Sequence, residues 1–434
     1  MMKTLHLTNA WHESSGGVST FYRALLKAAA EREQQIRLVV PGPADRVESA
    51  GPFGLIYYVR SPQAPCRSGY RFIPPYAFLS PRGTVAAILR AERPDLVEIN
   101  DKYTLNCAAG LLRLGALPGV KNRPVVVGLS CERLDETVAA YLFGGRFARW
   151  LSRRYMKWLY FPMCDHHIAV SWHTASELQL ASRGHRVSRA VWVRPMGVDA
   201  GLMSPARRSQ AIREELLSLV RGDSQTVLLL YVGRLAPEKN LGLLVNTLVG
   251  LPENYRLLIA GNGPLAGDLS RQAAAFGSRV AFLGHVSSRE GLADVYANCD
   301  VFVHTNPREP FGIAPLEAMA SGLPLVAPLT GGLRAYANPG NAWLAEPEPD
   351  SFAAAVVSAA SASPERGART AAARLTAERY NWPFVCAGYL DLYAEIYALF
   401  QHSKPPLRHK PDFVSTPGDW FGREPRTAQE ASCG

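Results

Sequence analysis

The chain has no long apolar segment and no organised set of cysteines. None of its apolar runs approaches the length of about eighteen residues that a membrane-spanning helix needs. Residues 1–17 lack the apolar core of a signal peptide, so we expect a cytoplasmic protein. The seven cysteines are scattered, without a Cys-x-x-Cys pair or any other metal-ligand spacing. We therefore expect reduced thiols, no disulfide framework and no structural metal.

Motifs for nucleic-acid binding are also missing. The sequence contains no helix-turn-helix, zinc-finger or ribonucleoprotein motif, and its basic residues are spread along the chain. The formal net charge is nevertheless +10, which is typical of a protein that meets phosphate-bearing molecules. Charge alone does not choose between a nucleotide sugar, an anionic lipid and a nucleic acid. Because the motifs are absent, nucleic acid is the weakest of the three, and we expect no nucleic-acid partner.

Short β-branched runs alternate with longer helical patterns along most of the chain, which is typical of parallel α/β sheets. We expect strands at residues 3–8, 36–40, 55–59, 96–99, 125–129, 167–170 and 190–193, and then at 226–232, 256–260, 280–283, 300–304 and 324–327. Glycine and proline follow the seventh strand, before a charged helical segment at 207–220. The pattern predicts two doubly wound domains, which we place at residues 1–196 and 205–380.

The C-terminal part of the chain has two different patterns. Residues 382–400 are helical in pattern, with regularly spaced apolar residues at Val385, Leu390, Leu392, Tyr393, Ile396 and Leu399. From residue 401 onward, prolines recur and apolar periodicity is lost. We therefore expect a disordered tail over residues 401–434.

Two glutamates, Glu309 and Glu317, bracket a Phe311-Gly312 turn that opens a helix. Gly312 allows backbone to approach a ligand closely, and the first helical N–H groups beyond it lack partners. The helix dipole attracts phosphate, while the two carboxylates can bind hydroxyl groups. The segment predicts a site for an anionic, hydroxyl-rich ligand. The alternative is a polar loop followed by a helix in which Glu317 is solvated.

Further segments around this pair occur in the order typical of one enzyme family. Residues 14–18 read Ser-Ser-Gly-Gly-Val, residues 194–199 read Arg-Pro-Met-Gly-Val-Asp, residues 231–240 read Tyr-Val-Gly-Arg-Leu-Ala-Pro-Glu-Lys-Asn, and residues 298–303 read Asn-Cys-Asp-Val-Phe-Val. Together with the glutamate pair they resemble the retaining nucleotide-sugar glycosyltransferases of family 4 (glycosyl transferases group 1), which have the GT-B fold. The resemblance covers about residues 1–400.

The resemblance implies two Rossmann-like domains that face each other across a cleft. The first would lie on the acceptor side and the second would bind the nucleotide sugar. Residues 381–400 would form a helix that returns to the first domain. No metal and no cofactor are implied, and no Asp-x-Asp metal motif precedes the glutamate pair.

The same resemblance implies roles for individual side chains. Arg234 and Lys239 would clamp the donor diphosphate, as charged groups that suit phosphate. Glu309 would contact the hydroxyls of the donor sugar, and Glu317 those of the ribose. The acceptor would attack from the face that the diphosphate leaves, which retains the anomeric configuration. The donor-binding residues would also include Gly16, Gly17, Phe311 and Gly312.

The acceptor half departs from the family pattern. Many relatives carry a histidine after the strand that corresponds to residues 125–129, whereas this chain continues Ser-Cys-Glu-Arg-Leu-Asp. The strand that ends near residue 99 also lacks the common histidine. The acceptor-side candidates are Asp101, Glu132 and Asp135, each with a structural role as the alternative. Arg334 stands where the family often has a glutamate.

Other functions fit the residues less well. The carboxyl groups of a glycosidase stand about 5 to 9.5 Å apart, whereas eight residues of continuous helix span about 12 Å. The glycines at 261, 263 and 267 do not form a dinucleotide fingerprint, because the third is displaced and Pro264 interrupts the turn. We predict hexosyl transfer from a UDP- or GDP-hexose to a glycan or lipid-linked acceptor. A GT-B phosphorylase, a nucleotide-sugar epimerase and a non-catalytic nucleotide-sugar-binding protein stay open as alternatives.

One segment suggests where the protein acts. The chain has no acidic residue between Thr137 and Cys164, and its basic residues there are Arg146, Arg149, Arg153, Arg154 and Lys157. On a helix most of them form one stripe, interleaved with aromatic and aliphatic residues. This pattern is typical of a helix that lies on an anionic surface, and it predicts peripheral association with the inner face of the membrane through residues 146–160. The alternative is a core helix with a solvated basic face.

Overall fold

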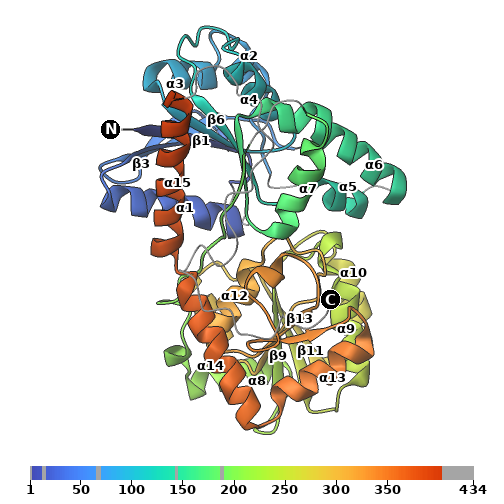
Figure 1. Cartoon of the computed structure of the whole chain (residues 1–434). Helices are drawn as coiled ribbons and strands as arrows, with labels where there is room; N and C mark the ends of the chain where they lie inside the picture. The colour runs from blue at the N-terminus through green and yellow to red at the C-terminus, as the bar shows by residue number, and fades with distance from the viewer. Residues whose placement is uncertain (1, 12–15, 65–69, 142–144, 186–189, 403–434) are drawn as a thin grey trace, which may run out of the picture.

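The computed structural model describes residues 2–11, 16–64, 70–141, 145–185 and 190–402. Figure 1 shows two α/β domains, one above the other, each built around a twisted sheet. The expected disordered tail lies outside the described residues, except for its first two positions, which are helical. We keep residues 1–196 and 205–380 as the proposed domain limits.

The first sheet has eight strands in the order β3-β4-β2-β1-β5-β6-β7-β8. All neighbours are parallel except β3 and β4. The strands are β1 (Lys3–Thr8), β2 (Gln35–Gly42), β3 (Arg46–Ser49), β4 (Gly54–Arg60), β5 (Leu96–Asn100), β6 (Val125–Ser130), β7 (His166–Ala169) and β8 (Val191–Val193). Alternate residues of β6 enter different cores, since Val125 and Val127 face one side and Val126 the other. Both faces are therefore covered, which explains why the central strands are continuously apolar.

Helices connect these strands and cover the sheet. They are α1 (Gly16–Glu31), α2 (Tyr76–Leu79), α3 (Thr84–Glu92), α4 (Asn106–Arg113), α5 (Leu134–Tyr141), α6 (Gly145–Tyr155) and α7 (Trp172–Ser182). In α1, Phe21, Leu25 and Ala29 are buried and form the inner face of the helix. After α6 the chain continues as a π-helical turn over Met156–Tyr160.

The second sheet has six parallel strands in the order β11-β10-β9-β12-β13-β14. They are β9 (Val227–Val232), β10 (Tyr255–Ala260), β11 (Val280–Gly284), β12 (Val301–Val303), β13 (Leu325–Pro328) and β14 (Trp343–Ala345). The helices around them are α8 (Gln210–Leu219), α9 (Leu241–Asn246), α10 (Ala266–Ala273), α11 (Arg289–Ala297), α12 (Ile313–Ala320), α13 (Pro349–Ala360) and α14 (Pro364–Arg379).

Every strand expected from the sequence is present, and two further strands were not expected. β3 is a short, mostly exposed edge strand, so it lacks the apolar pattern on which the prediction depends. β14 has only three residues. The helix expected at 207–220 begins later, at Gln210, because Ser204 caps a separate 3-10 turn over Pro205–Arg207.

The C-terminal helix α15 (Trp382–His402) returns to the first domain, as expected, and packs across α1 (Figure 1). The junction is tied by backbone hydrogen bonds from Trp382 N to Val198 O and from Val198 N to Tyr380 O. Leu399 was expected on the buried face but is 46% exposed, whereas its neighbours Tyr397 and Phe400 pack against the core.

A buried carboxylate lies where α15 meets the sheet. Glu98 of β5 accepts hydrogen bonds from Tyr22 of α1 at 2.9 Å and from Tyr393 of α15, and it contacts His6 of β1 at 3.0 Å. All four side chains are almost completely buried. Burial, followed by the charge of Glu98, raises the pKa of both tyrosines, so they act as hydroxyl donors. Elements from the two ends of the chain, β1 and α1 on one side and α15 on the other, are thus joined to β5 at one carboxylate.

We predict that Tyr393→Phe lowers the free energy of unfolding by about 1–3 kcal/mol, because it leaves a buried carboxylate oxygen without a donor. Urea denaturation followed by circular dichroism measures the change. The matched control is Tyr397→Phe on the same helix, whose hydroxyl bonds the carboxylate of Asp95 in a less buried position. Equal effects of the two substitutions would contradict the role given to Glu98.

Candidate active site

The loop after β12 carries the first of the two glutamates into the space between the domains. Gly312 directly precedes α12 and has a φ of 86°, in the left-handed region that favours glycine. A Cβ atom there would lie 3.1 Å from the hydroxyl of Tyr336 and 3.2 Å from Cγ of Glu309. The Tyr336 hydroxyl donates to the carbonyl of Gly312, which fixes the turn. Phe311 is buried beside Tyr336 and Tyr380, so its role here is to anchor the loop.

Three side chains converge on one oxygen of Glu309. Its Oε2 accepts from Lys239 Nζ at 2.7 Å and from Asn306 Nδ2 at 2.9 Å, and His304 Nε2 lies 3.4 Å away. The last distance is longer than an ordinary hydrogen bond, so His304 acts as a close polar neighbour. Among the described residues, no donor binds Oε1 of Glu309. The carboxylate is therefore held firmly through one oxygen while the other stays available.

The charge of Glu309 is stabilised in spite of its burial. Only 8% of the residue is exposed. Burial pushes its pKa upward, but the charge of Lys239 and the contacts with His304 outweigh that effect and hold the pKa well below its usual range. Glu309 is thus ionised at neutral pH, and an ionised carboxylate is a strong acceptor for hydroxyl groups.

Lys239 is positioned by its loop. It ends the 3-10 turn Pro237–Lys239, and Asn240 then adopts φ of 53° before α9 begins. The Thr305 hydroxyl donates to the carbonyl of Lys239, and Asn240 Nδ2 donates to the carbonyl of Thr305. The loop after β9 and the loop after β12 are therefore tied together, as expected for neighbouring parallel strands that share a carboxyl edge.

Arg234 lies at the end of β9 and faces the other domain. Its guanidinium lies 5.6 Å from the ring centre of Tyr70, and Nη1 is 3.5 Å from the Tyr70 hydroxyl. Tyr70 belongs to the first domain, so this contact crosses the cleft. The structure brings Arg234 and Lys239 to the same edge of the second sheet, where the sequence predicts a diphosphate clamp.

Glu317 has a partner that the sequence did not indicate. Its Oε1 accepts from Arg289 Nη1 of α11 at 2.8 Å, and its Oε2 accepts from the Tyr296 hydroxyl at 3.1 Å. Burial raises the pKa of Tyr296 strongly, and the charge of Glu317 adds to it. Glu317 is only 4% exposed, whereas the Arg289 side chain is 38% exposed. The solvated alternative for Glu317 is therefore wrong.

Gly16 and Gly17 begin α1 and are exposed. A Cβ atom on Gly17 would lie 3.3 Å from Cδ1 of Ile313, the first residue of α12. The N-terminal ends of two helices, one from each domain, thus meet at the cleft. Their unpaired N–H groups and dipoles favour an anion between them.

The three acceptor-side candidates differ in how much of each carboxylate is already used. Asp101 accepts from the backbone N–H groups of residues 103, 104 and 105 and from Asn9, so it organises the turn before α4. Asp135 is buried and pairs with Arg133 at 2.9 Å. Glu132 is partly exposed and accepts from the Tyr103 hydroxyl at 2.9 Å and from the Thr137 hydroxyl at 3.5 Å. All three stay acceptor-side candidates, and the contacts of Asp101 and Asp135 favour structural roles for those two.

The first domain also touches the donor loop directly. The Ser171 hydroxyl, which caps α7, donates to the carbonyl of Pro310, next to Glu309. Helix α5 lies against the turn that carries Lys239. His304, Asn306, Arg289 and Ser171 were not predicted from the sequence. Of these four, only His304 and Asn306 could have been found from the sequence, because they follow β12 at the carboxyl edge of the sheet.

Family models and related proteins match both halves of the chain. Glycosyltransferase Family 4 matches residues 15–201, and Glycosyl transferases group 1 matches residues 219–391. A GDP-mannose-dependent alpha-(1-6)-phosphatidylinositol dimannoside mannosyltransferase of Mycobacterium tuberculosis is 29% identical over 395 residues, covering 90% of this chain and 95% of that protein. A sulfoquinovosyl transferase of Arabidopsis thaliana is 30% identical over 275 residues, or 61% of this chain and 48% of that protein.

Solved structures share the fold. An Anabaena protein, Alr3699/HepE, in complex with UDP and glucose has a TM-score of 0.68 at 19% identity, covering 91% of this chain and 100% of that one. Sucrose-phosphate synthase from Thermosynechococcus elongatus has a TM-score of 0.71 at 19% identity, covering 92% and 100%. Both family matches fall in order on the two domains whose loops form the site. The chain belongs to the GT-B glycosyltransferases of the family 4 and group 1 type.

Proposed function

We propose that the protein moves a hexosyl group from a nucleotide sugar to a glycan or lipid-linked acceptor, with retention of the anomeric configuration. The observation that carries this proposal is the Glu309 carboxylate, ionised and fixed through Oε2 by Lys239 and Asn306, with Oε1 available for a sugar hydroxyl. The relatives that use GDP-mannose and the neighbour that holds UDP and glucose support a nucleotide-sugar donor.

In the proposed mechanism, Arg234 and Lys239 neutralise the diphosphate as it leaves. The Lys239 ammonium carries three N–H donors, so it can hold Glu309 and a phosphate oxygen together. Glu309 then ties the donor sugar to the same cation that stabilises the leaving group. Positive charge develops at the anomeric carbon, and preorganised charges lower its cost. The acceptor attacks from the side of the leaving diphosphate.

The ribose end of the donor is proposed to lie near Glu317. Because Arg289 and Tyr296 already bond both oxygens of Glu317, the ribose hydroxyls must use the remaining lone pairs or displace Arg289. GDP-mannose is the first donor to test, since the relative that spans most of this chain depends on it. A thermal-shift panel of nucleotide sugars ranks donors, because a ligand that binds the folded state raises the melting temperature.

The first prediction concerns the ion pair. Glu309→Gln and Lys239→Ala should each lower turnover by about a hundredfold, the scale of losing one preorganised charged contact. Steady-state kinetics with the best donor measure the effect, and circular dichroism checks the fold. The control is Glu346→Gln, an exposed glutamate of the same domain, which should leave turnover unchanged. Wild-type rates in both folded site variants would refute the assignment.

A second prediction concerns metal. We expect activity to survive dialysis against EDTA, because the leaving diphosphate is neutralised by Arg234, Lys239 and helix N-terminal amides. A matched sample dialysed without chelator provides the reference rate. Complete loss of activity that manganese restores would overturn the metal-independent mechanism.

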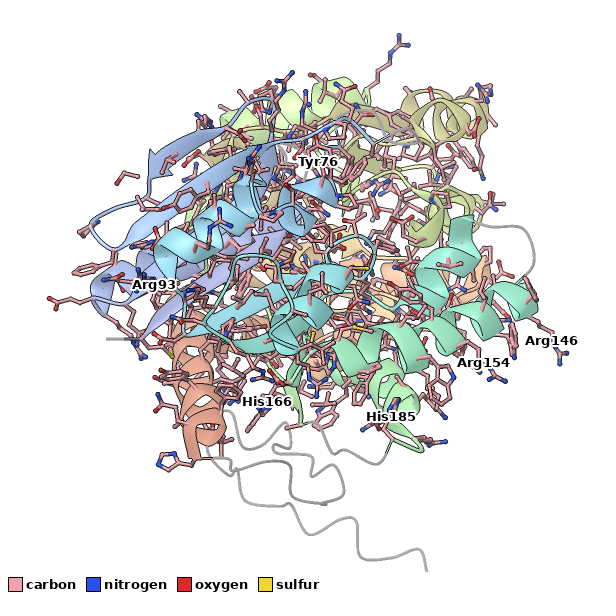
Figure 2. The ribbon with its side chains drawn as sticks, turned by 90° about the horizontal axis from the view of Figure 1, so that it is seen from above. Tyr76, Arg93, Arg146, Arg154, His166 and His185 are labelled. Carbon is pink, nitrogen blue, oxygen red and sulfur yellow. The ribbon has the colours of Figure 1, made fainter. Side chains whose placement is uncertain are left out.

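We also propose that the protein associates with an anionic membrane through residues 146–160. In α6 only Ala148 and Ser152 are buried, while Phe147, Trp150 and Leu151 are at least half exposed. The exposed apolar side chains of α6 support an interfacial helix over a core helix, whereas Met156 and Tyr160 of the following turn are buried in the core. Figure 2 shows Arg146 and Arg154 on this helix, which projects from the side of the first domain. In the described part of the chain, no helix is both long and apolar enough to span a membrane.

We predict that the protein co-sediments with anionic liposomes at low salt. Each basic residue near such a surface contributes about 1 kcal/mol, so changing Arg149, Arg153 and Lys157 to Glu should abolish binding. Neutral phosphatidylcholine liposomes are the control and should not retain the protein. Failure of the wild type to bind, or unchanged binding of the triple variant, would rule the membrane association out.

A further inference from the structure

A cavity lies apart from the donor site, under the same basic helix. It has a volume of about 330 Å³ and is bounded by the start of α5, the end of α6, the π-helical turn and α7. Its lining residues are Asp135, Trp150, Arg153, Arg154, Met156, Lys157, Glu177, Leu180 and Ala181. None of them contacts Glu309 or Glu317 directly. The cavity is therefore a second concave site in the first domain, and the proposed function does not use it.

The electrostatics of the cavity favour an anion. Two carboxylates line it, and both are buried and paired with cations: Glu177 with Lys102 at 2.7 Å, and Asp135 with Arg133 at 2.9 Å and with Arg153 of the lining at 3.8 Å. Burial pushes the pKa of Asp135 upward, but the hydrogen bonds and charge of Arg133, together with the charges of Arg153 and Lys102, hold this pKa below its usual value. The three basic residues of the lining consequently give it an excess of positive charge.

The basic side chains stand at the mouth of the cavity. Arg153 is 58% exposed and 3.8 Å from Asp135, the guanidinium of Arg154 lies 5.3 Å from the ring centre of Trp150, and Lys157 lies 5.3 Å from that of Trp158. Cations placed on aromatic faces are partly desolvated and held in place. The two indoles are themselves about half exposed, so apolar surface lies beside the basic residues of the lining.

We propose that this cavity is a headgroup site, which binds the phosphate and short polyol of an anionic glycerophospholipid while the neighbouring aromatic residues enter the membrane interface. A guanidinium can bind phosphate with two parallel hydrogen bonds. Such bonds need a defined site, whereas diffuse attraction to a charged surface does not. The volume is at the lower end of small-molecule sites, so it suits a headgroup and excludes the acyl chains. This inference rests on the proposed membrane association and adds a defined lipid contact to it.

A defined site and diffuse attraction make different predictions for matched charge changes. Arg153 and Lys157 line the cavity, whereas Arg146 and Arg149 belong to the same helix and do not. Diffuse attraction depends on the number of charges, so removing either pair should cost about thirtyfold in affinity. A headgroup site predicts a further loss of about tenfold for the lining pair only.

The test measures binding to vesicles of phosphatidylglycerol and phosphatidylcholine for the wild type, for Arg153→Ser with Lys157→Ser, and for Arg146→Ser with Arg149→Ser. A third variant, Leu180→Trp, narrows the cavity without changing charge. We expect the lining pair to lose about tenfold more affinity than the control pair, and Leu180→Trp to weaken binding. All variants should keep the wild-type thermal shift with the donor, which shows that they are folded.

Equal losses for the two pairs together with normal binding of Leu180→Trp would overturn the headgroup site and leave peripheral binding in place. Binding of free glycerol 3-phosphate as tight as that of the vesicles would overturn the lipid as its source in favour of a soluble phosphate. A wild type that binds no vesicles would refute both membrane claims. Donor transfer is measured separately, so none of these results bears on glycosyl transfer itself.

Discussion

The ion pair between Lys239 and Glu309 is the interaction on which the site depends. A carboxylate as buried as Glu309 is unfavourable unless a cation and hydrogen-bond donors compensate it. Satisfying it brings together the loop after β9 and the loop after β12, which the sequence separates by 70 residues. Close to this pair, the Tyr336 hydroxyl donates to the carbonyl of Gly312 and fixes the turn. The geometry of the candidate site thus depends on neutralising one buried charge.

The other domain completes the site through a few specific contacts. Ser171 reaches the carbonyl of Pro310, Tyr70 lies against Arg234, and the start of α1 meets the start of α12 at Gly17 and Ile313. At helix α15 the chain crosses from the second domain back to the first. Tyr393 of this helix is held by Glu98 deep in the first domain. The relative position of the two domains therefore depends on polar contacts at the cleft and on a buried anchor far from it.

The sequence predicted the fold well because the parallel strands carry a local signal. Each central strand is a short apolar run, and it was recognised without knowledge of its neighbours. β3 was missed because its residues are exposed, and β14 because it is too short. In the site, Glu309 and Lys239 were predicted from family motifs, while Arg289 and Ser171 were not. Their contacts with Glu317 and Pro310 span 28 and 139 residues, and no local pattern indicates such pairs.

For residues 146–160, composition alone does not show which face of the helix the domain covers. Basic residues interleaved with Phe147, Trp150 and Leu151 suit a core helix and an interfacial helix equally, because both need one apolar and one charged face. The difference depends on which face the rest of the domain covers. Here the small residues Ala148 and Ser152 face inward, and the large apolar residues do not. A helix that contributes its small side to the core has its large apolar side free for a surface that is not part of the protein, and the basic residues beside it favour a negatively charged one.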